Sequence, residues 1–186
     1  MRVIAGKARS LPLKSVDSAG TRPTQDRTKE TLFNVIHNSV YDSCFLDLFS
    51  GSGAIGIEAL SRGAKKAYFV ENNKKALQYI EQNLEFTKLK EDAVIVKKDV
   101  NDALKEFESQ GLKFDIIFVD PPYNQLLEKE VLIFLSKSVL IDNCSMIIIE
   151  ASKETDFSYI DNLGFRIIKT KEYKTNKHVF VELGGV

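Results

Sequence analysis

From Cys44 onward, short apolar runs alternate with longer amphipathic segments, and this alternation restricts the fold more than any other feature. One of the longer segments, 74–86, repeats apolar residues at the spacing of a helix face, namely Leu77, Ile80 and Leu84. Strands that alternate with helices form a parallel sheet with helices on both faces. Near the end of the chain, two apolar runs flank the polar segment 172–177, which is typical of an antiparallel hairpin.

We therefore predict an α/β fold with a doubly wound, mostly parallel sheet of seven strands that ends in this hairpin. With right-handed crossovers, the first three strands run outward and the fourth returns beside the first. Ligands bind at such a switch point, at the carboxyl ends of the strands. The predicted strands cover 45–49, 67–71, 93–97, 114–119 and 145–150, followed by 165–171 and 178–183 in the hairpin. The predicted helices cover 54–61, 74–86, 102–107 (with Asn101 as its cap) and 126–135.

The first 40 residues do not continue the alternation. Segments 2–5 and 11–14 fit a small hairpin, and 15–23 is typical of a loop. Thr24 is a candidate cap for a following helix. The inward face of that helix contains Leu32, Phe33 and Ile36.

Chain length and charge distribution indicate that the N-terminal residues form a separate extension and are candidates for a binding function. A chain of 186 residues can form one sizeable core and a small extension, so we predict an extension over 1–40 and one domain over 41–186. Up to Thr31 there are seven basic and three acidic residues, and because the net charge is zero, the remainder is acidic by four. A basic arm on an acidic body fits nucleic-acid binding, and a solvated flank fits equally well. The candidate phosphate-binding residues are Arg2, Lys7, Arg9, Arg22 and Arg27.

Other residue types point away from several classes of protein. Cys44 and Cys144 have no spacing typical of a metal or redox pair, and we expect reduced core residues. His37 and His178 lie far apart in the sequence, so we expect no metal. The opening MRVIAGKARS lacks the apolar segment of a signal peptide, and no apolar run reaches membrane-spanning length. These features predict a cytoplasmic protein without a membrane partner.

A glycine-rich segment follows the first predicted strand. Gly51, Gly53 and Gly56 match G-x-G-x-x-G between a strand and a helix, and Glu71 lies at the end of the next strand. Glycines let the backbone pass close to a ligand, and the acid can accept hydrogen bonds from ribose hydroxyls. This pattern fits a dinucleotide site, and a tight turn without a ligand is the structural alternative.

Two residues before the glycines favour another ligand. Asp47 and Phe49 give the segment the form D-x-F-x-G-x-G. An acid at this point would repel a pyrophosphate and would attract a cation. S-adenosylmethionine fits, because it is an adenosine without phosphates that has an ammonium and a sulfonium group.

The fourth predicted strand runs into Asp120-Pro121-Pro122-Tyr123. Together with TRPTQDRTKETLF (21–33) and LDLFSGSGAIGIEALSRGA (46–64), the segment FVDPPY (118–123) resembles the bacterial 16S ribosomal RNA guanine-N2 methyltransferases. The resemblance covers nearly the whole chain in motif order, and after Glu150 only the pattern matches.

This resemblance implies a Rossmann-like methyltransferase sheet, S-adenosylmethionine as cofactor, and 16S rRNA or a small-subunit particle as partner. It also implies cofactor contacts: Asp47, Phe49, Gly51 and Gly53 at the methionine end, Glu71 at the ribose and Asp99 at the adenine amino group. We expect a monomer.

The Asp-Pro-Pro-Tyr residues suit methyl transfer to an exocyclic amino nitrogen, whose lone pair is delocalised into the base. Asp120 can accept one amino hydrogen and the carbonyl of Pro121 the other, which favours the increasingly positive nitrogen of the transition state. Pro121 and Pro122 fix the backbone direction in advance. Tyr123 can stack on the base and orient it. We expect transition-state stabilisation with late proton loss.

A base inside a helix cannot reach such a cleft, so the target is unpaired or flipped out. Arg22 and Thr24 belong to a segment that contacts either RNA or the edge of the cofactor, and the sequence leaves both open. Two other functions also remain open. One is an amino methyltransferase acting on adenine or cytosine in DNA, although no target-recognition domain is evident. The other is a non-catalytic nucleotide- or RNA-binding module.

Overall fold

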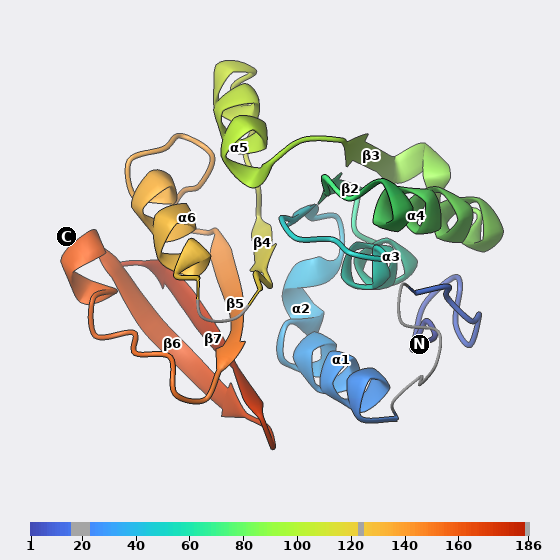
Figure 1. Cartoon of the computed structure of the whole chain (residues 1–186), viewed down its shortest axis with the longest axis horizontal. Helices are drawn as coiled ribbons and strands as arrows, with labels where there is room; N and C mark the ends of the chain where they lie inside the picture. Colours follow the sequence, from blue (N-terminus) through green and yellow to red (C-terminus); the bar gives the residue numbers. More distant parts are fainter. Residues whose placement is uncertain (16–22, 123–124, 185–186) are drawn as a thin grey trace.

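The computed structural model describes residues 1–15, 23–122 and 125–184, and a single sheet forms its centre (Figure 1). Within these residues the sheet has seven strands in the order β3-β2-β1-β4-β5-β7-β6. The strands are β1 (Cys44–Asp47), β2 (Lys66–Val70), β3 (Ala93–Val96), β4 (Ile116–Val119), β5 (Met146–Ser152), β6 (Phe165–Glu172) and β7 (Asn176–Leu183). The helices are α1 (Pro23–Val35), α2 (His37–Val40), α3 (Ala54–Ser61), α4 (Lys74–Thr87), α5 (Val100–Ser109) and α6 (Leu127–Leu135), with short 3₁₀ helices at Lys90–Asp92 and Asp161–Leu163.

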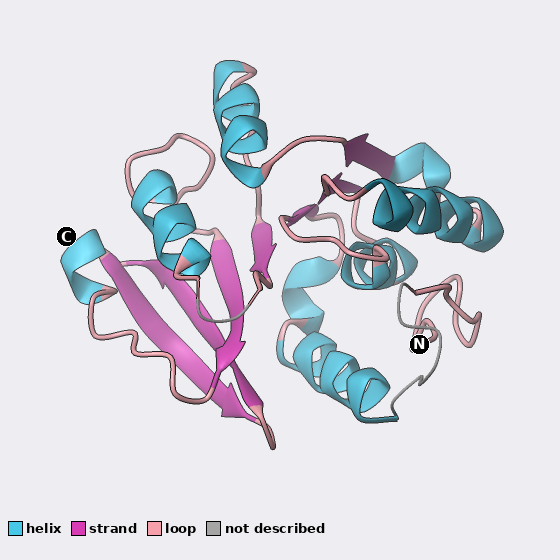
Figure 2. Ribbon diagram, viewed as in Figure 1, coloured by secondary structure: helices cyan, strands magenta, loops and turns pink. Residues whose placement is uncertain are grey.

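The predicted fold class is confirmed, and so is the predicted order of the first four strands. β1 to β5 run parallel to one another, and β7 is antiparallel to both β5 and β6 (Figure 2). The order reverses at β1, which lies between β2 and β4. The carboxyl ends of β1 and β4 therefore meet at the switch point, where the sequence placed its two motifs.

Several predicted boundaries differ from the observed ones. β1, β2 and β3 end at Asp47, Val70 and Val96, slightly before the predicted ends, because the chain turns into loops at the ligand edge. β4 begins at Ile116 rather than at Phe114 as predicted. The N–H of Phe114 donates to the carbonyl of Leu140 at 2.9 Å and not to a neighbouring strand. β5, β6 and β7 extend beyond the predicted bounds, and α6 begins at Leu127.

Two predicted helix caps are wrong. Asp99, in an extended conformation, caps α5 and accepts a hydrogen bond from the N–H of Asn101 at 3.0 Å, so Asn101 lies inside the helix. Both residue types are good caps, and the backbone conformation decides between them. α1 begins at Pro23, so Thr24 also lies inside its helix. Proline is favoured at the first helical position because its missing N–H would have no intrahelical partner there.

Each face of the sheet has its own apolar core. One core joins α1, α3 and α4 to the side chains of Phe45, Phe118 and Ile148. The other joins α5 and α6 to the opposite face, including Ile117 and Ile149. Because successive residues of a strand point to opposite faces, Asp47 and Asp120 continue the row of Phe45 and Phe118 toward the α1 and α3 side.

The N-terminal segment packs on the same core through Val3, Ala8 and Leu13. Within the described part of this segment, the predicted hairpin is reduced to one antiparallel bridge between Arg2 and Pro12. The predicted inward residues of α1 and its following turn are all buried: Leu32, Phe33 and Ile36.

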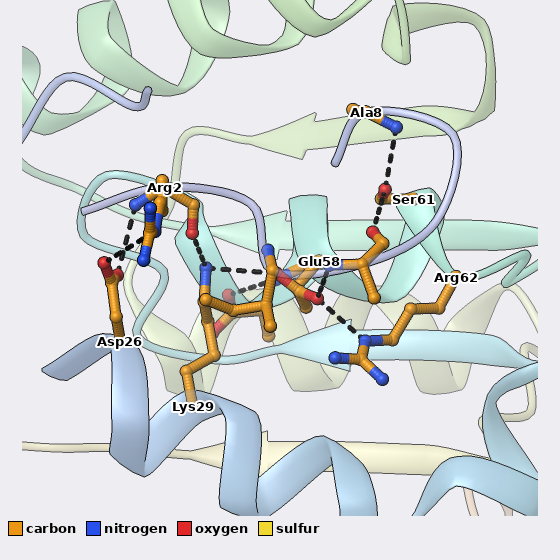
Figure 3. A network of polar contacts seen from close by, with 11 residues as sticks. Arg2, Ala8, Asp26, Lys29, Glu58, Ser61 and Arg62 are labelled. Carbon is orange, nitrogen blue, oxygen red and sulfur yellow. Dashed lines mark hydrogen bonds and ion pairs between the residues drawn. The ribbon is translucent and has the colours of Figure 1, made fainter. Parts of the chain in front are cut away.

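Glu58 of α3 holds this segment in place (Figure 3). Its carboxylate accepts hydrogen bonds from the N–H groups of Ile4 at 2.8 Å and Ala5 at 3.0 Å. It also pairs with Lys29 of α1 at 3.2 Å and with Arg62 at 2.7 Å. The first residues, α1 and α3 are therefore joined at one fully buried acid.

The cysteine prediction is half wrong. Both cysteines are free thiols, but Cys144 is exposed and Cys44 is half-buried at the start of β1. Cys144 lies in the turn before β5, where its N–H donates to Asp142 at 2.9 Å, so the turn places its side chain toward solvent.

Candidate active site

Two adjoining cavities lie where β1 and β4 end. The first has a volume of about 440 Å³ and the second about 760 Å³. Phe49, Gly51 and Asp120 line both cavities. The two sequence motifs therefore share one cleft, as their positions at the switch point predicted.

The glycine loop forms the wall between strand and helix. At Gly51, with φ of +53°, an added Cβ would meet nothing within 4 Å, so the backbone faces open space. At Gly56 in α3, an added Cβ would lie 2.4 Å from the ring of Phe69 in β2. The first glycine thus permits close approach of a ligand, and the last permits close packing of helix on sheet. Gly53 directly precedes α3.

Glu71 ties the glycine loop to the next strand. One carboxylate oxygen accepts from the N–H of Gly51 at 2.9 Å. The other accepts from the N–H groups of Asn72 at 2.9 Å and Asn73 at 2.8 Å. Glu71 lines the second cavity together with Asp99, which is exposed and also caps α5. A carboxylate has about four acceptor positions, so this tie leaves Glu71 able to accept a ligand hydroxyl.

Asp47 is almost fully buried beside the glycine loop and lines the first cavity. Its carboxylate accepts from the N–H of Gly56 at 3.2 Å. Burial raises the pKa of Asp47 to about 7, and the negative charge of Glu71 adds to the shift, whereas the Gly56 bond opposes it. Burial destabilises the ionised form of an acid that has no cation beside it, so this position favours a ligand with a positively charged group.

Asp120 directly follows β4 and is surrounded by other acids. Burial raises the pKa of Asp120 well above its ordinary value, and Glu150 and Asp47 raise it further. Pro121 is buried, Pro122 is exposed, and both line the second cavity. A carboxylate with a raised pKa is a better hydrogen-bond and proton acceptor than an ordinary aspartate.

Three residues at this cleft were not predicted from the sequence: Glu150, Asn176 and His178, which all line the first cavity. Glu150 follows the apolar run of β5 much as Asp120 follows that of β4, and this position was the available signal. His178 is nearly fully buried, and its nitrogens lie 3.0 Å from Glu150 and 3.0 Å from the hydroxyl of Tyr173.

Asn83 of α4 was also missed. Its side-chain amide donates to the carbonyls of Ser52 at 3.0 Å and Lys14 at 2.9 Å, and its oxygen accepts from the N–H of Lys14 at 2.8 Å. This buried residue therefore joins the N-terminal segment to the glycine loop. A polar residue on an amphipathic helix gives no sequence signal of such a contact.

The basic candidates are brought together in part. Arg2, Arg9 and Arg27 line one groove of about 650 Å³, with Asp26 and Glu30 on its wall. The carboxylate of Asp26 lies 3.6 Å from the Arg2 guanidinium. Lys7 is exposed on the neighbouring turn. Arg22 and Tyr123 lie outside the described residues.

Across residues 1–15, 23–122 and 125–184, two kinds of feature are absent. No group of three or more His, Cys, Asp or Glu side chains there is arranged to hold a metal ion. None of the helices in the same ranges is long and apolar enough to cross a membrane.

Comparison with known proteins agrees with this geometry. The chain is similar to the Bacillus subtilis protein YlbH, with 35% identity over 172 residues that cover 92% of each chain. It is 37% identical over 155 residues to the Haemophilus influenzae protein named ribosomal RNA small subunit methyltransferase D, covering 83% of this chain and 80% of that protein. The Escherichia coli protein of the same name is 35% identical, with 83% and 76% covered.

Solved structures give the same result. The structure of Escherichia coli yhhF superposes with a TM-score of 0.82 at 29% identity, covering 100% of this chain and 99% of that one. A hypothetical protein of Thermus thermophilus superposes equally well, at 0.82 and 30% identity, over 98% and 99% of the two chains. The family described as conserved hypothetical protein 95 matches residues 1–182. The chain therefore belongs to this family, together with the bacterial proteins named ribosomal RNA small subunit methyltransferase D.

Proposed function

We propose that this protein transfers a methyl group from S-adenosylmethionine to the exocyclic N2 amino group of a guanine in 16S ribosomal RNA. The relatives named ribosomal RNA small subunit methyltransferase D support the reaction and the RNA. One observation supports the chemistry most: Asp120, Pro121 and the glycine loop border the same cleft. This arrangement suits an amino group held on one side and a methyl donor on the other.

The residues of the two cavities fit S-adenosylmethionine. Asp47 provides a buried negative charge for a cationic group, and the backbone at Gly51 faces open space. Glu71 and Asp99 line the second cavity, where they suit ribose hydroxyls and an adenine amino group. When bound, the cofactor supplies a methyl group on a positively charged sulfur.

In the reaction, a bond forms between the guanine N2 and the methyl carbon while the bond from sulfur to that carbon breaks. Held beside Asp47 and Gly51, the cofactor would supply a neutral thioether as the leaving group, which would keep the electron pair of the broken bond, and the amino nitrogen would become positive. Asp120 and the Pro121 carbonyl accept the two amino hydrogens and stabilise this charge. One proton then leaves the nitrogen, and Asp120, with its raised pKa, is the group positioned to receive it. Tyr123 is proposed to stack on the base.

The target guanine has to leave any helix to reach Asp120, because the cavity accepts a single base rather than a duplex. The groove lined by Arg2, Arg9 and Arg27 is proposed to hold RNA phosphates beside the cleft, with exposed Lys7 nearby. On this proposal residues 1–40 form the RNA-binding extension of the methyltransferase domain at 41–186. We propose that the protein acts as a monomer, without a metal, in the cytoplasm where its RNA is found.

The test is mass mapping of 16S rRNA from cells that lack the gene, before and after incubation with the purified protein and S-adenosylmethionine. The expected result is one guanine nucleotide that gains a single methyl group at N2. The Asp120→Ala variant should leave the RNA unmodified. A methyl group on adenine or cytosine, or activity on DNA alone, would refute the proposal.

A further inference from the structure

Acidic side chains form a row across the ligand edge of the sheet. β4 and β5 pair in parallel, with Phe118 opposite Ile148 and Val119 opposite Ile149. Continued by one residue beyond the end of β4, this register places Asp120 opposite Glu150, on the same face as Phe118 and Ile148. Both acids line the first cavity. Two acceptor groups therefore lie side by side where the proposed reaction needs one.

Neighbouring side chains hold Glu150 firmly. The side-chain amide of Asn176 donates to one oxygen at 2.5 Å, and Nε2 of His178 lies 3.0 Å from the other. His178 is opposite Glu150 in the β5–β7 pairing and is 1% exposed. Its other nitrogen lies 3.0 Å from the hydroxyl of Tyr173. With a hydrogen on Nε2, the ring donates to Glu150, and Nδ1 is then placed to accept from the hydroxyl of Tyr173.

These contacts orient Glu150 as an acceptor at the cavity. Asn176 and His178 both act as donors toward it, and a carboxylate accepts up to about four hydrogen bonds. Edge-on ring contacts further fix His178, whose centroid lies 4.9 Å from that of Tyr173 and 6.1 Å from that of Phe118. A side chain held in this way has little entropy left to lose when a ligand binds.

Guanine presents adjacent donors that match adjacent acceptors. Its ring N1–H lies next to the N2 amino group, so one acid can accept from each. Adenine and cytosine also have an amino group, but the ring nitrogen beside it has no hydrogen and is itself an acceptor. A carboxylate facing that nitrogen would place two acceptors together, which is unfavourable in a water-poor site.

We infer that Glu150, held by Asn176 and His178, accepts a hydrogen bond from N1–H of the target base and makes the enzyme select guanine. This inference rests on the proposed function and adds the residue that reads the base. Asp120 acts on the amino group that all three candidate bases share, and Glu150 acts on the ring position by which they differ.

The test uses the full chain and an RNA that contains, at the mapped nucleotide, either guanine or 2,6-diaminopurine. The analogue keeps the N2 amino group but has no hydrogen on N1. Wild-type protein should use guanine about 10- to 100-fold better in kcat/KM, as expected for one base-edge contact. Glu150→Gln should lower kcat/KM on guanine and reduce the ratio to within about 3-fold, because an amide can donate to the unprotonated N1. The binding affinity for the two RNAs, measured without cofactor, should also show a smaller preference for guanine in Glu150→Gln than in wild type.

Glu182→Gln is the matched control. Glu182 lies on β7 near the sheet edge where β5 begins, which is opposite the edge that borders the cavities, and it pairs with Arg166. This variant should keep the wild-type ratio. If wild-type protein uses both RNAs equally, or if Glu150→Gln keeps the full preference, the inference is wrong. If Glu150→Gln methylates neither RNA, the ratio of its binding affinities for the guanine and 2,6-diaminopurine RNAs replaces the kcat/KM ratio. A full preference for guanine in binding would then refute the inference, and a reduced preference would support it. Absence of methylation on any ribosomal guanine by wild-type protein would instead refute the proposed function.

Discussion

Asp120 and Glu71 lie at the same cleft but have different neighbours. Asp120 borders both cavities next to Glu150, whereas Glu71 is tied to the glycine loop and to the turn before α4. The first position suits the methyl acceptor and the second suits the cofactor. Substitutions at the two residues should therefore affect different measurements.

Asp120→Ala should abolish methyl transfer and leave S-adenosylmethionine affinity within a few-fold. Glu71→Ala should weaken that affinity by roughly 1 to 3 kcal/mol, because it removes charged hydrogen bonds and loosens the glycine loop. Calorimetric titration with S-adenosylmethionine, beside a transfer assay, separates the two effects. Comparable losses of cofactor affinity in both variants would place Asp120 on the cofactor side, and unchanged affinity in Glu71→Ala would remove Glu71 from the site.

The burial of Asp47 predicts how the free energy of unfolding depends on pH. Its pKa is raised from 3.8 to about 7, so the folded state binds this proton more tightly than the unfolded state does. Ionisation is therefore disfavoured by folding, and the free energy of unfolding should fall as pH rises from about 4 to about 7. The full effect is at most about 4 kcal/mol, at 1.36 kcal/mol for each pKa unit.

Asp47→Asn removes this ionisation and should be more stable than wild type at pH 8 in the absence of cofactor, with little difference at pH 4. Its cofactor affinity should fall, because the ammonium group loses its counter-charge. Urea unfolding at the two pH values measures the stability, and Asp92→Asn, at an exposed acid, is the control. A variant that is less stable than wild type at pH 8 would contradict the burial argument.

Three elements meet at Glu58, and this contact joins the N-terminal segment to α1 and α3. Lys29 from α1 is 3% exposed, and burial lowers its pKa although Glu58 opposes the shift. The N–H groups of Ile4 and Ala5 donate hydrogen bonds to the same carboxylate. Removing one partner of a buried ion pair leaves the other charge uncompensated, which costs more than the pair itself contributes.

Glu58→Gln should therefore lower the free energy of unfolding by about 3 to 5 kcal/mol. Glu85→Gln is the matched control, because Glu85 pairs with Lys90 at 2.7 Å on the surface, where both side chains are more than half exposed. The control should change stability by no more than about 1 kcal/mol. Urea unfolding of both variants gives the comparison, and equal effects would show that the buried contact is not the attachment point.

Over the whole molecule the charges balance, but one groove near the cleft is lined by three arginines and only two acids. The net charge of the chain is zero, while Arg2, Arg9 and Arg27 share one groove. Arg2 is partly compensated by Asp26, so Lys7, Arg9 and Arg27 are the better candidates for phosphate contacts. Phosphate contacts release counterions, and their number sets the salt dependence of binding.

Replacing Lys7, Arg9 and Arg27 together with Gln should weaken RNA binding and make it less dependent on salt. The log–log slope should fall by about 0.7 to 0.9 for each phosphate that the variant no longer neutralises, with cofactor affinity unchanged. RNA affinity across a salt series measures the slope. The control replaces three exposed lysines on the α5 and α6 side of the sheet: Lys105, Lys113 and Lys137. Parallel lines for wild type and the first variant would mean that the groove makes no phosphate contacts.

The sequence was sufficient for features that depend on neighbouring residues. Apolar periodicity predicted the strands and helices from β1 onward, and right-handed crossovers fixed the order that places β1 between β2 and β4. The ends of parallel strands share one edge of a sheet. For this reason the positions of Asp47, Asp120 and Glu71 in the sequence already predicted that these residues would meet at one cleft.

Other features depend on contacts between distant segments, which no local pattern encodes. His178 reaches Glu150 because β7 returns antiparallel beside β5, and Glu58 reaches Ile4 across 54 residues. The raised pKa of Asp47 depends on exclusion of water, which only the packed chain achieves. The choice between Asp99 and Asn101 as helix cap depended on backbone conformation. Local physics thus sets the elements and their order, whereas burial and long-range pairing set the charges and hydrogen bonds of the site.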